Sequence, residues 1–169
     1  IFLGQFISFF GSTMTSVVVP VQIYQATQST FLVGMIGITQ LIPVLLFSLW
    51  GGALADRFDR RKIIIYTEWV MILGVALLLY NSWELQPQVW MVFLVSFLVQ
   101  SAGTFHRPAL DGLMQALTPP QDFAAMAAWG SLRFSVGMIG GSALGGWIAT
   151  QWGARAAYGL DLVTYGVSF

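Results

Sequence analysis

The stretch that decides the fold is FLVGMIGITQLIPVLLFSLWGGALA, residues 31–55, which is followed at once by the charged segment DRFDRRK, residues 56–62. About 20 mostly apolar residues carry an α-helix across the hydrocarbon core of a bilayer. A second apolar run, residues 63–80, follows the charges directly. We therefore predict two spanning helices joined by a short charged loop. Barrel strands are excluded, because the runs are too long and show no alternation between two faces.

The composition of the whole chain is that of a membrane protein. Of its 169 residues, 57% are hydrophobic and only 8% are charged, whereas soluble domains carry about 25% charged residues. So few charges would leave large apolar patches facing water. Seven basic residues balance seven acidic ones, which argues against a nucleic-acid partner.

No pattern in the sequence is typical of an enzyme. The absence of cysteine excludes disulfides and thiolate zinc sites. Walker A, H-E-x-x-H and G-x-S-x-G motifs are also absent. A lone histidine without a carboxylate cluster makes no metal site. We therefore expect no catalysis, no cofactor and no metal.

Apolar runs separated by polar or proline-rich breaks predict an all-α bundle of six spanning helices. The break between the fourth and fifth helices contains Thr118-Pro119-Pro120, and proline interrupts a helix. The chain begins and ends inside apolar runs, so we expect a fragment whose sixth helix is truncated. The predicted helices span residues 1–24, 31–55, 63–80, 89–105, 124–149 and 156–169.

Basic residues in short loops predict the orientation of the bundle, since such residues are enriched on the cytoplasmic side. Most of them lie between the second and third helices or just after the fourth. These are Arg57, Arg60, Arg61, Lys62 and Arg107. We therefore place both loops in the cytoplasm. Trp83, Trp90 and Trp152 then lie near the opposite edge, where aromatic belts form.

Polar side chains recur on one face of two predicted helices. Within each helix they are three, four or seven residues apart, so they share a face. The first helix carries Gln5, Ser8, Ser12, Thr15 and Gln22, and the fourth carries Ser96, Gln100, Thr104 and Arg107. Lipid offers such groups no partner. One interpretation is a substrate cavity lined by both helices, and the other is hydrogen bonding between packed helices.

Small residues form a ridge along the predicted fifth helix. Gly137, Gly141 and Gly145 are spaced four apart, and Gly146 follows the last of them. This spacing lets a neighbouring backbone approach closely. Tight packing is one interpretation, and a smooth surface on which helices slide or rock is the other.

Three charged residues lie within predicted spans, where charges are costly and mark function. Glu68 and Asp161 are candidate proton carriers, and Arg133 is a candidate partner for an anion or a counter-ion. The alternative is an internal ion pair, or a side chain that reaches the membrane surface in the case of Glu68.

The charged loop resembles motif A of the major facilitator superfamily, which runs G-x-L-a-D-R-x-G-R-R/K. The matching positions are Gly52, Leu54, Asp56, Arg57, Arg60 and Arg61, and Asp59 stands where the family usually has a second glycine. The resemblance implies that Asp56 holds a cytoplasmic gate. It implies that the arginines surround that aspartate as a charge relay.

The glycine ridge is similar to motif C of the same superfamily, which accompanies export by exchange. Gly137, Gly141, Gly145 and Gly146 match, whereas Ser142 stands where proline is usual. The segments Phe6–Ser8, Val19–Ile23 and Gly51–Arg57 also resemble the branch of bacterial drug and siderophore exporters.

The resemblance implies the first six-helix half of a twelve-helix transporter that works by alternating access. We expect proton-coupled efflux of small amphipathic organic molecules across the bacterial inner membrane. The expected partners are that small-molecule substrate, the lipid bilayer, protons and a C-terminal half outside this sequence. An importer of a small polar solute and a non-transporting receptor or scaffold are the alternatives.

Overall fold

The computed structural model describes residues 2–84 and 86–168, except for the side chains of residues 2, 3, 49, 51–56, 167 and 168. Within those ranges the chain is helical almost throughout and contains no strand. The predicted all-α fold is therefore confirmed. Its elements are α1 (Phe2–Thr27), α2 (Thr30–Arg57), α3 (Arg60–Trp83), α4 (Val89–Leu117), the short η1 (Pro120–Asp122), α5 (Phe123–Val136), the π-helical η2 (Gly137–Gly141), α6 (Ser142–Gln151) and α7 (Gly153–Ser168).

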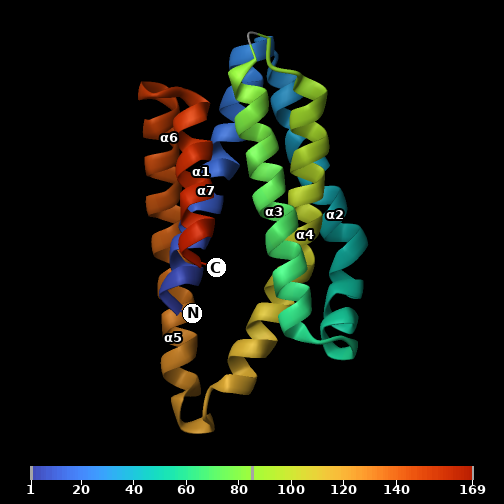
Figure 1. The fold of residues 1–169 in the computed structure, drawn as a ribbon, viewed down its shortest axis with the longest axis vertical. Helices are drawn as coiled ribbons and strands as arrows, with labels where there is room; N and C mark the ends of the chain where they lie inside the picture. The colour runs from blue at the N-terminus through green and yellow to red at the C-terminus, as the bar shows by residue number, and fades with distance from the viewer. Residues whose placement is uncertain (1, 85, 169) are drawn as a thin grey trace.

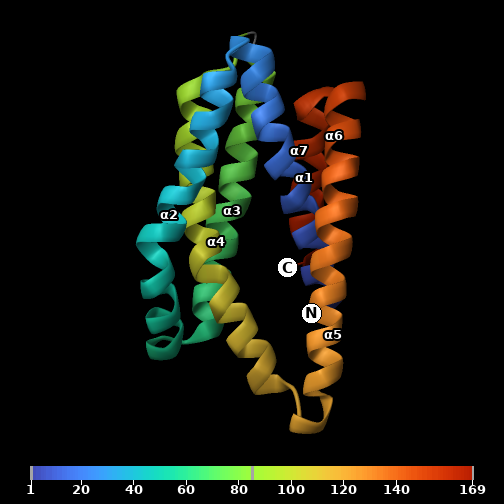
Figure 2. The ribbon, with the colours of Figure 1, turned by 180° about the vertical axis from the view of Figure 1, so that it is seen from behind.

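Successive helices run antiparallel, and α5, η2 and α6 form one continuous rod (Figure 1). The α1–α2, α3–α4 and α6–α7 turns lie at one end of the molecule, and the α2–α3 and α4–α5 turns lie at the other (Figure 2). Helices α2, α3 and α4 pack together on one side, while α1, α6 and α7 pack together on the other. The two groups meet mainly where α3 contacts α7 and where α1 contacts α2.

The surface of this bundle is suited to lipid. Four helices contain stretches long and apolar enough to cross a bilayer, namely Gly4–Thr27, Thr30–Ser48, Arg60–Trp83 and Val89–Leu117. Large apolar side chains point outward, and those of Phe31, Leu45 and Ile139 are 73%, 66% and 75% exposed. Such a surface is unfavourable in water, whereas hydrocarbon accommodates it. The chain is therefore a membrane protein.

Several helices extend beyond their predicted bounds, as α3 and α4 illustrate. The predicted segment 63–80 is part of α3, which begins at Arg60, and the segment predicted to end at residue 105 belongs to α4, which continues to Leu117. Hydropathy marks the part of a helix that lies in lipid rather than the end of the helix. Pro108 lies inside α4 without ending it, because the loss of one backbone donor kinks a helix that other contacts hold. The bend is visible in the second half of α4 (Figure 1).

Asp59 starts α3. It has an extended backbone (φ −61°, ψ 110°), and its side chain accepts a hydrogen bond from the Arg61 backbone N–H at 3.0 Å. This contact satisfies one of the free donors of the first helical turn. Its φ is negative, so the conformation does not require the glycine that is usual at this position of motif A. The departure from the motif therefore has a structural explanation.

The glycine ridge packs against α1. Gly137, Gly141 and Gly145 all face that helix, and a Cβ atom at Gly145 would lie only 2.8 Å from the Met14 Cα. Gly146 differs from them, because no atom lies within 4 Å of the place its Cβ would occupy. The absent side chains let the two backbones touch, as in other small-residue contacts between membrane helices.

Gly145→Ala tests this contact. The added methyl meets the α1 backbone, which cannot rotate away, so we expect a loss of about 1–3 kcal/mol in the free energy of unfolding. Gly146→Ala is the matched control, because its methyl enters open space and alanine favours the helix. Thermal unfolding of the complete transporter in detergent compares the two. Equal melting temperatures for both variants would contradict the packing described.

Asp59→Ala tests the helix cap. We expect it to lower the free energy of unfolding by about 1 kcal/mol, because the backbone donor at Arg61 loses its partner. Asp59→Asn keeps an acceptor and should retain the stability of the native protein. The same unfolding measurement applies, and an alanine variant as stable as the asparagine variant would argue against the cap.

Candidate functional site

Helices α1 and α7 are joined by a line of polar contacts. The Thr15 hydroxyl donates to the Asp161 carboxylate. One turn away, the hydroxyl groups of Ser12 and Tyr165 are 2.9 Å apart. Further along, the Tyr158 hydroxyl donates to Gln22 Oε1 at 2.6 Å. We call the six residues Ser12, Thr15, Gln22, Tyr158, Asp161 and Tyr165 the α1–α7 seam.

Asp161 is the buried charge of the seam, with a fully enclosed side chain. Besides Thr15, it lies beside Thr164, whose hydroxyl donates to the Asp161 carbonyl oxygen at 2.6 Å and is 3.3 Å from Oδ1. A glycine at position 11 of α1 makes room for these groups, because a Cβ there would overlap both Asp161 Oδ1 and Thr164 Oγ1. Hydroxyl groups hydrogen-bond a carboxylate without cancelling its charge. The charge of the carboxylate therefore remains costly to bury. A proton or a cation that neutralised this charge would lower that cost.

The seam accounts for most of the polar stripe predicted on the first helix. Ser12, Thr15 and Gln22 face α7, and the Ser8 carbonyl accepts from the Ser12 hydroxyl at 3.0 Å. Gln5 is half-buried near the start of α1. In the described part of the chain, Gln22 Nε2 has no hydrogen-bond partner. This leaves one donor of the seam free for water or a ligand.

The polar stripe of α4 has different neighbours. Gln100 and Thr104 line a pocket of about 350 Å³ between α4 and α2, together with Val44, Ser48 and Arg107. Ser96 is buried, and its hydroxyl has no partner among the described residues. Among the described residues that line this pocket, none comes from the polar stripe of α1. Helix α4 packs mainly on α2 and α3, whereas α1 packs mainly on α7 and α6.

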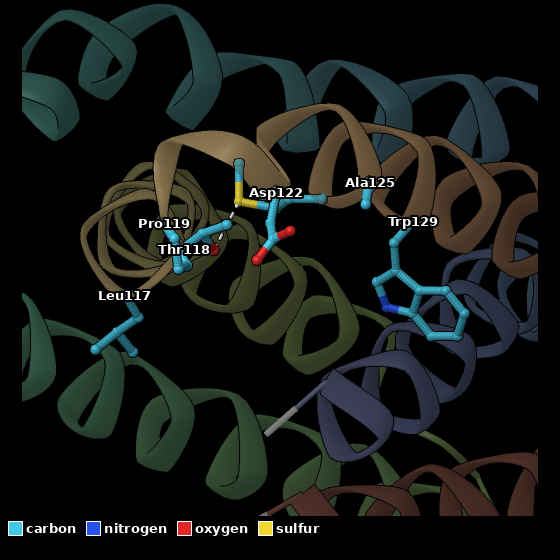
Figure 3. A pocket seen from close by; sticks show the side chains of 7 residues that line it. Leu117, Thr118, Pro119, Asp122, Ala125 and Trp129 are labelled. Atoms are coloured by element: carbon cyan, nitrogen blue, oxygen red, sulfur yellow. Dashed lines mark hydrogen bonds between the residues drawn. The ribbon is translucent and has the colours of Figure 1, made fainter.

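Sequence analysis missed a second pocket, at the junction of α4 and α5. It measures about 390 Å³ and is lined by Leu117, Thr118, Pro119, Asp122, Met126 and Trp129, among others. Figure 3 shows the Asp122 carboxylate and the Trp129 ring on the same side of this turn. The Thr118 hydroxyl donates to the Met114 carbonyl oxygen at 2.8 Å and lies 3.3 Å from the Met126 sulfur across the turn. The Pro119–Pro120 pair indicated a helix end, but no pattern in the sequence indicated that the residues before and after it line one pocket.

The two other intramembrane charges lie apart from Asp161 in the sequence and on other helices. Glu68 is buried in α3, at 6% exposure. Arg133 is half-buried on α5, with its guanidinium 5.7 Å from the centre of the Phe9 ring, which is a cation–π distance. Near Glu68, the Thr67 hydroxyl is 2.9 Å from His106 Nδ1 and joins α3 to α4.

The motif A segment lies at the end of the molecule that holds the α2–α3 and α4–α5 turns. Arg60 donates to the Gly112 carbonyl oxygen of α4 at 2.7 Å. Arg57 and Arg61 are exposed. Gly52 and Asp56 lie within α2, and their side-chain positions fall outside the described residues. Of the predicted gate, the structure therefore describes one link, from Arg60 to α4.

The motif C residues lie at the contact between α1 and the α5–α6 rod. The backbone hydrogen bonds of the rod are π-helical from Gly137 to Gly141. Ser142 is the first residue of α6, and it is half-buried. A helical residue at 142 keeps its backbone donor, which the proline usual at this motif position would lack. Single π-helical turns within α-helices occur frequently at functional sites.

Comparison with known proteins places the chain among transporters. It is 26% identical over 164 residues to macrolide efflux protein A of Streptococcus pyogenes, covering 96% of this chain and 40% of that protein. It is 29% identical over 161 residues to the enterobactin exporter EntS of Salmonella choleraesuis (strain SC-B67), covering 95% and 39%. The chain thus spans about two fifths of the length of these relatives. No solved structure matches it.

A family model gives the broadest match. The model described as Major Facilitator Superfamily covers residues 1–169. This agrees with the all-helical, lipid-facing bundle and with the motif A and motif C resemblances. The chain therefore belongs to the major facilitator superfamily of membrane transporters.

Proposed function

We propose that this chain is one six-helix half of a secondary active exporter of the bacterial inner membrane. The cargo is a small amphipathic organic molecule, which crosses by alternating access between two halves of the complete polypeptide. The observation that carries this proposal is the family match over residues 1–169, together with relatives named as a macrolide efflux protein and an enterobactin exporter. The motif A loop is placed in the cytoplasm, because basic residues are enriched on that side.

Proton coupling is assigned to Asp161. Its exposed fraction is zero, against 6% for Glu68, and hydroxyl groups of α1 and α7 hydrogen-bond its carboxylate. A change of its charge alters the contact between α1 and α7, because Thr15 of α1 donates directly to the carboxylate. A ligand or proton can shift a conformational equilibrium only through such a differential interaction.

The gate is assigned to the motif A end. Asp56, Arg57, Arg60 and Arg61 hold the cytoplasmic ends of the helices in one of the two states. The Arg60 contact with the Gly112 carbonyl supports this assignment, because it ties α3 to the last turns of α4. A charge-assisted hydrogen bond of this type is short and about twice as strong as a neutral one.

Asp161→Asn tests the coupling role. The amide is nearly isosteric and still accepts from Thr15, but it cannot carry a proton at neutral pH. We expect everted vesicles of this variant to lose cargo accumulation driven by a proton gradient, while cargo still exchanges down its own gradient. Glu84→Gln is the matched control, because Glu84 is exposed at the α3–α4 turn. Gradient-driven accumulation at the native rate would remove Asp161 from the coupling step.

Asp56→Asn tests the gate. We expect normal insertion in the membrane but no transport, because the variant loses the charge that favours one state. The measurement is efflux of a lipophilic dye from cells, with membrane abundance determined by immunoblotting. Native efflux would contradict the gating role.

The everted vesicles described for Asp161 also report the direction of transport. Uptake into the cell by the native protein would favour an importer.

A further inference from the structure

The pocket between α2 and α4 gathers hydrogen-bond donors around one positive charge. Ser48 comes from α2, while Gln100, Thr104 and Arg107 come from successive turns of α4. The volume of about 350 Å³ is within the range of small-molecule sites. No acidic residue is among those that line this pocket in the described part of the chain.

Most of these donors are not used within the bundle. The Thr104 hydroxyl donates to the Gln100 carbonyl oxygen at 2.9 Å. No hydrogen bond or ion pair joins the side chains of Ser48, Gln100 and Arg107 to other described residues. Asp111 lies one turn beyond Arg107 on α4, and no ion pair joins these two described residues. The guanidinium is therefore free to bind a ligand.

The rest of the pocket is apolar. Val44 of α2 and Pro108 of α4 line it. The same two helices are joined by the ring pair of Phe47 and Phe105, whose centroids are 5.5 Å apart. A ligand that fits such a wall has an apolar body, and the donors select a group that accepts hydrogen bonds.

We propose that this pocket binds the oxyanion of an amphipathic organic cargo, such as a carboxylate or sulfonate, with Arg107 as the charged partner. Gln100 and Ser48 supply neutral donors to the same group. The planar guanidinium suits this role because it offers two parallel N–H groups to an oxyanion. The inference rests on the proposed export function, because it takes the ligand to be the transported molecule. The phosphate of an anionic phospholipid shares this chemistry.

The test compares two probes that share their aromatic rings, one with an anionic and one with a neutral sulfonyl group. Anilinonaphthalene sulfonate and its neutral sulfonamide are titrated, by fluorescence, into the complete transporter in phosphatidylcholine nanodiscs. The variants are Arg107→Gln and Arg107→Lys. Lys62→Gln is the matched control, because it removes one exposed positive charge that does not line the pocket.

We expect Arg107→Gln to weaken sulfonate binding by about 10-fold or more, since a charge-assisted hydrogen bond is lost. Sulfonamide binding should not change. The lysine variant should recover part of the affinity, because it keeps the charge without the planar fork. Lys62→Gln should bind both probes as the native protein does. Unchanged sulfonate binding by Arg107→Gln, or an equal loss of both probes, would overturn the proposal.

Two further arms keep the result interpretable. If Arg107→Gln does not fold, Ser48→Ala takes its place, and equal binding of the sulfonate by Ser48→Ala and the native protein then counts against the site. Nanodiscs with phosphatidylglycerol identify the source of the oxyanion. That lipid could displace the sulfonate, and it could bind to the native protein but not to the variant. This result would assign the pocket to a lipid headgroup and overturn the cargo assignment. Transport of the sulfonamide in vesicles tests the export function separately.

Discussion

The need to satisfy polar groups without water governs how this bundle is built. Hydrocarbon offers no hydrogen-bond partners, so a buried hydroxyl, amide or carboxyl is costly unless it finds a partner within the bundle. The α1–α7 seam meets this need around Asp161, which is the most costly of these groups to bury. The same seam favours one register of α7 on α1, because a shift of either helix would break its three contacts.

Close approach of the backbones makes this register possible. Helix α1 has short side chains and glycine where it meets α7, and it receives the glycine ridge of the α5–α6 rod on another side. Packing in a membrane depends on such contacts, because lipid tails are as apolar as leucine and the hydrophobic effect does not hold helices together. The polar seam and the glycine ridge thus make α1 the centre of one half of the bundle. In contrast, α4 packs against α2 and α3. Between α4 and α2 lies a pocket whose lining includes hydrogen-bond donors without partners among the described residues.

The chain separates its charges by location. Most basic residues gather at the α2–α3 loop, where Asp59 begins α3 and Arg60 reaches the α4 backbone. Charges within the spans are few, and two acidic ones, Glu68 and Asp161, are buried. This division suits a transporter, because charges at the ends can stabilise one conformation while a charge inside responds to a proton. The proposed functions of the gate and the seam depend on this division.

The sequence alone determined the all-α membrane fold, the superfamily and the approximate helices, because apolar runs of spanning length and the motif A loop are local patterns. It also identified Ser12, Thr15 and Gln22 as polar groups that must avoid lipid. Only the tertiary structure decided that these residues face Asp161 and the tyrosines of α7 rather than the stripe of α4. A repeat along one helix shows which residues share a face, but not which helix that face meets. For the same reason, the α2–α4 pocket and the pocket beside Trp129 depended on packing, since each is lined by residues of two segments whose contact no repeat along a single helix predicts.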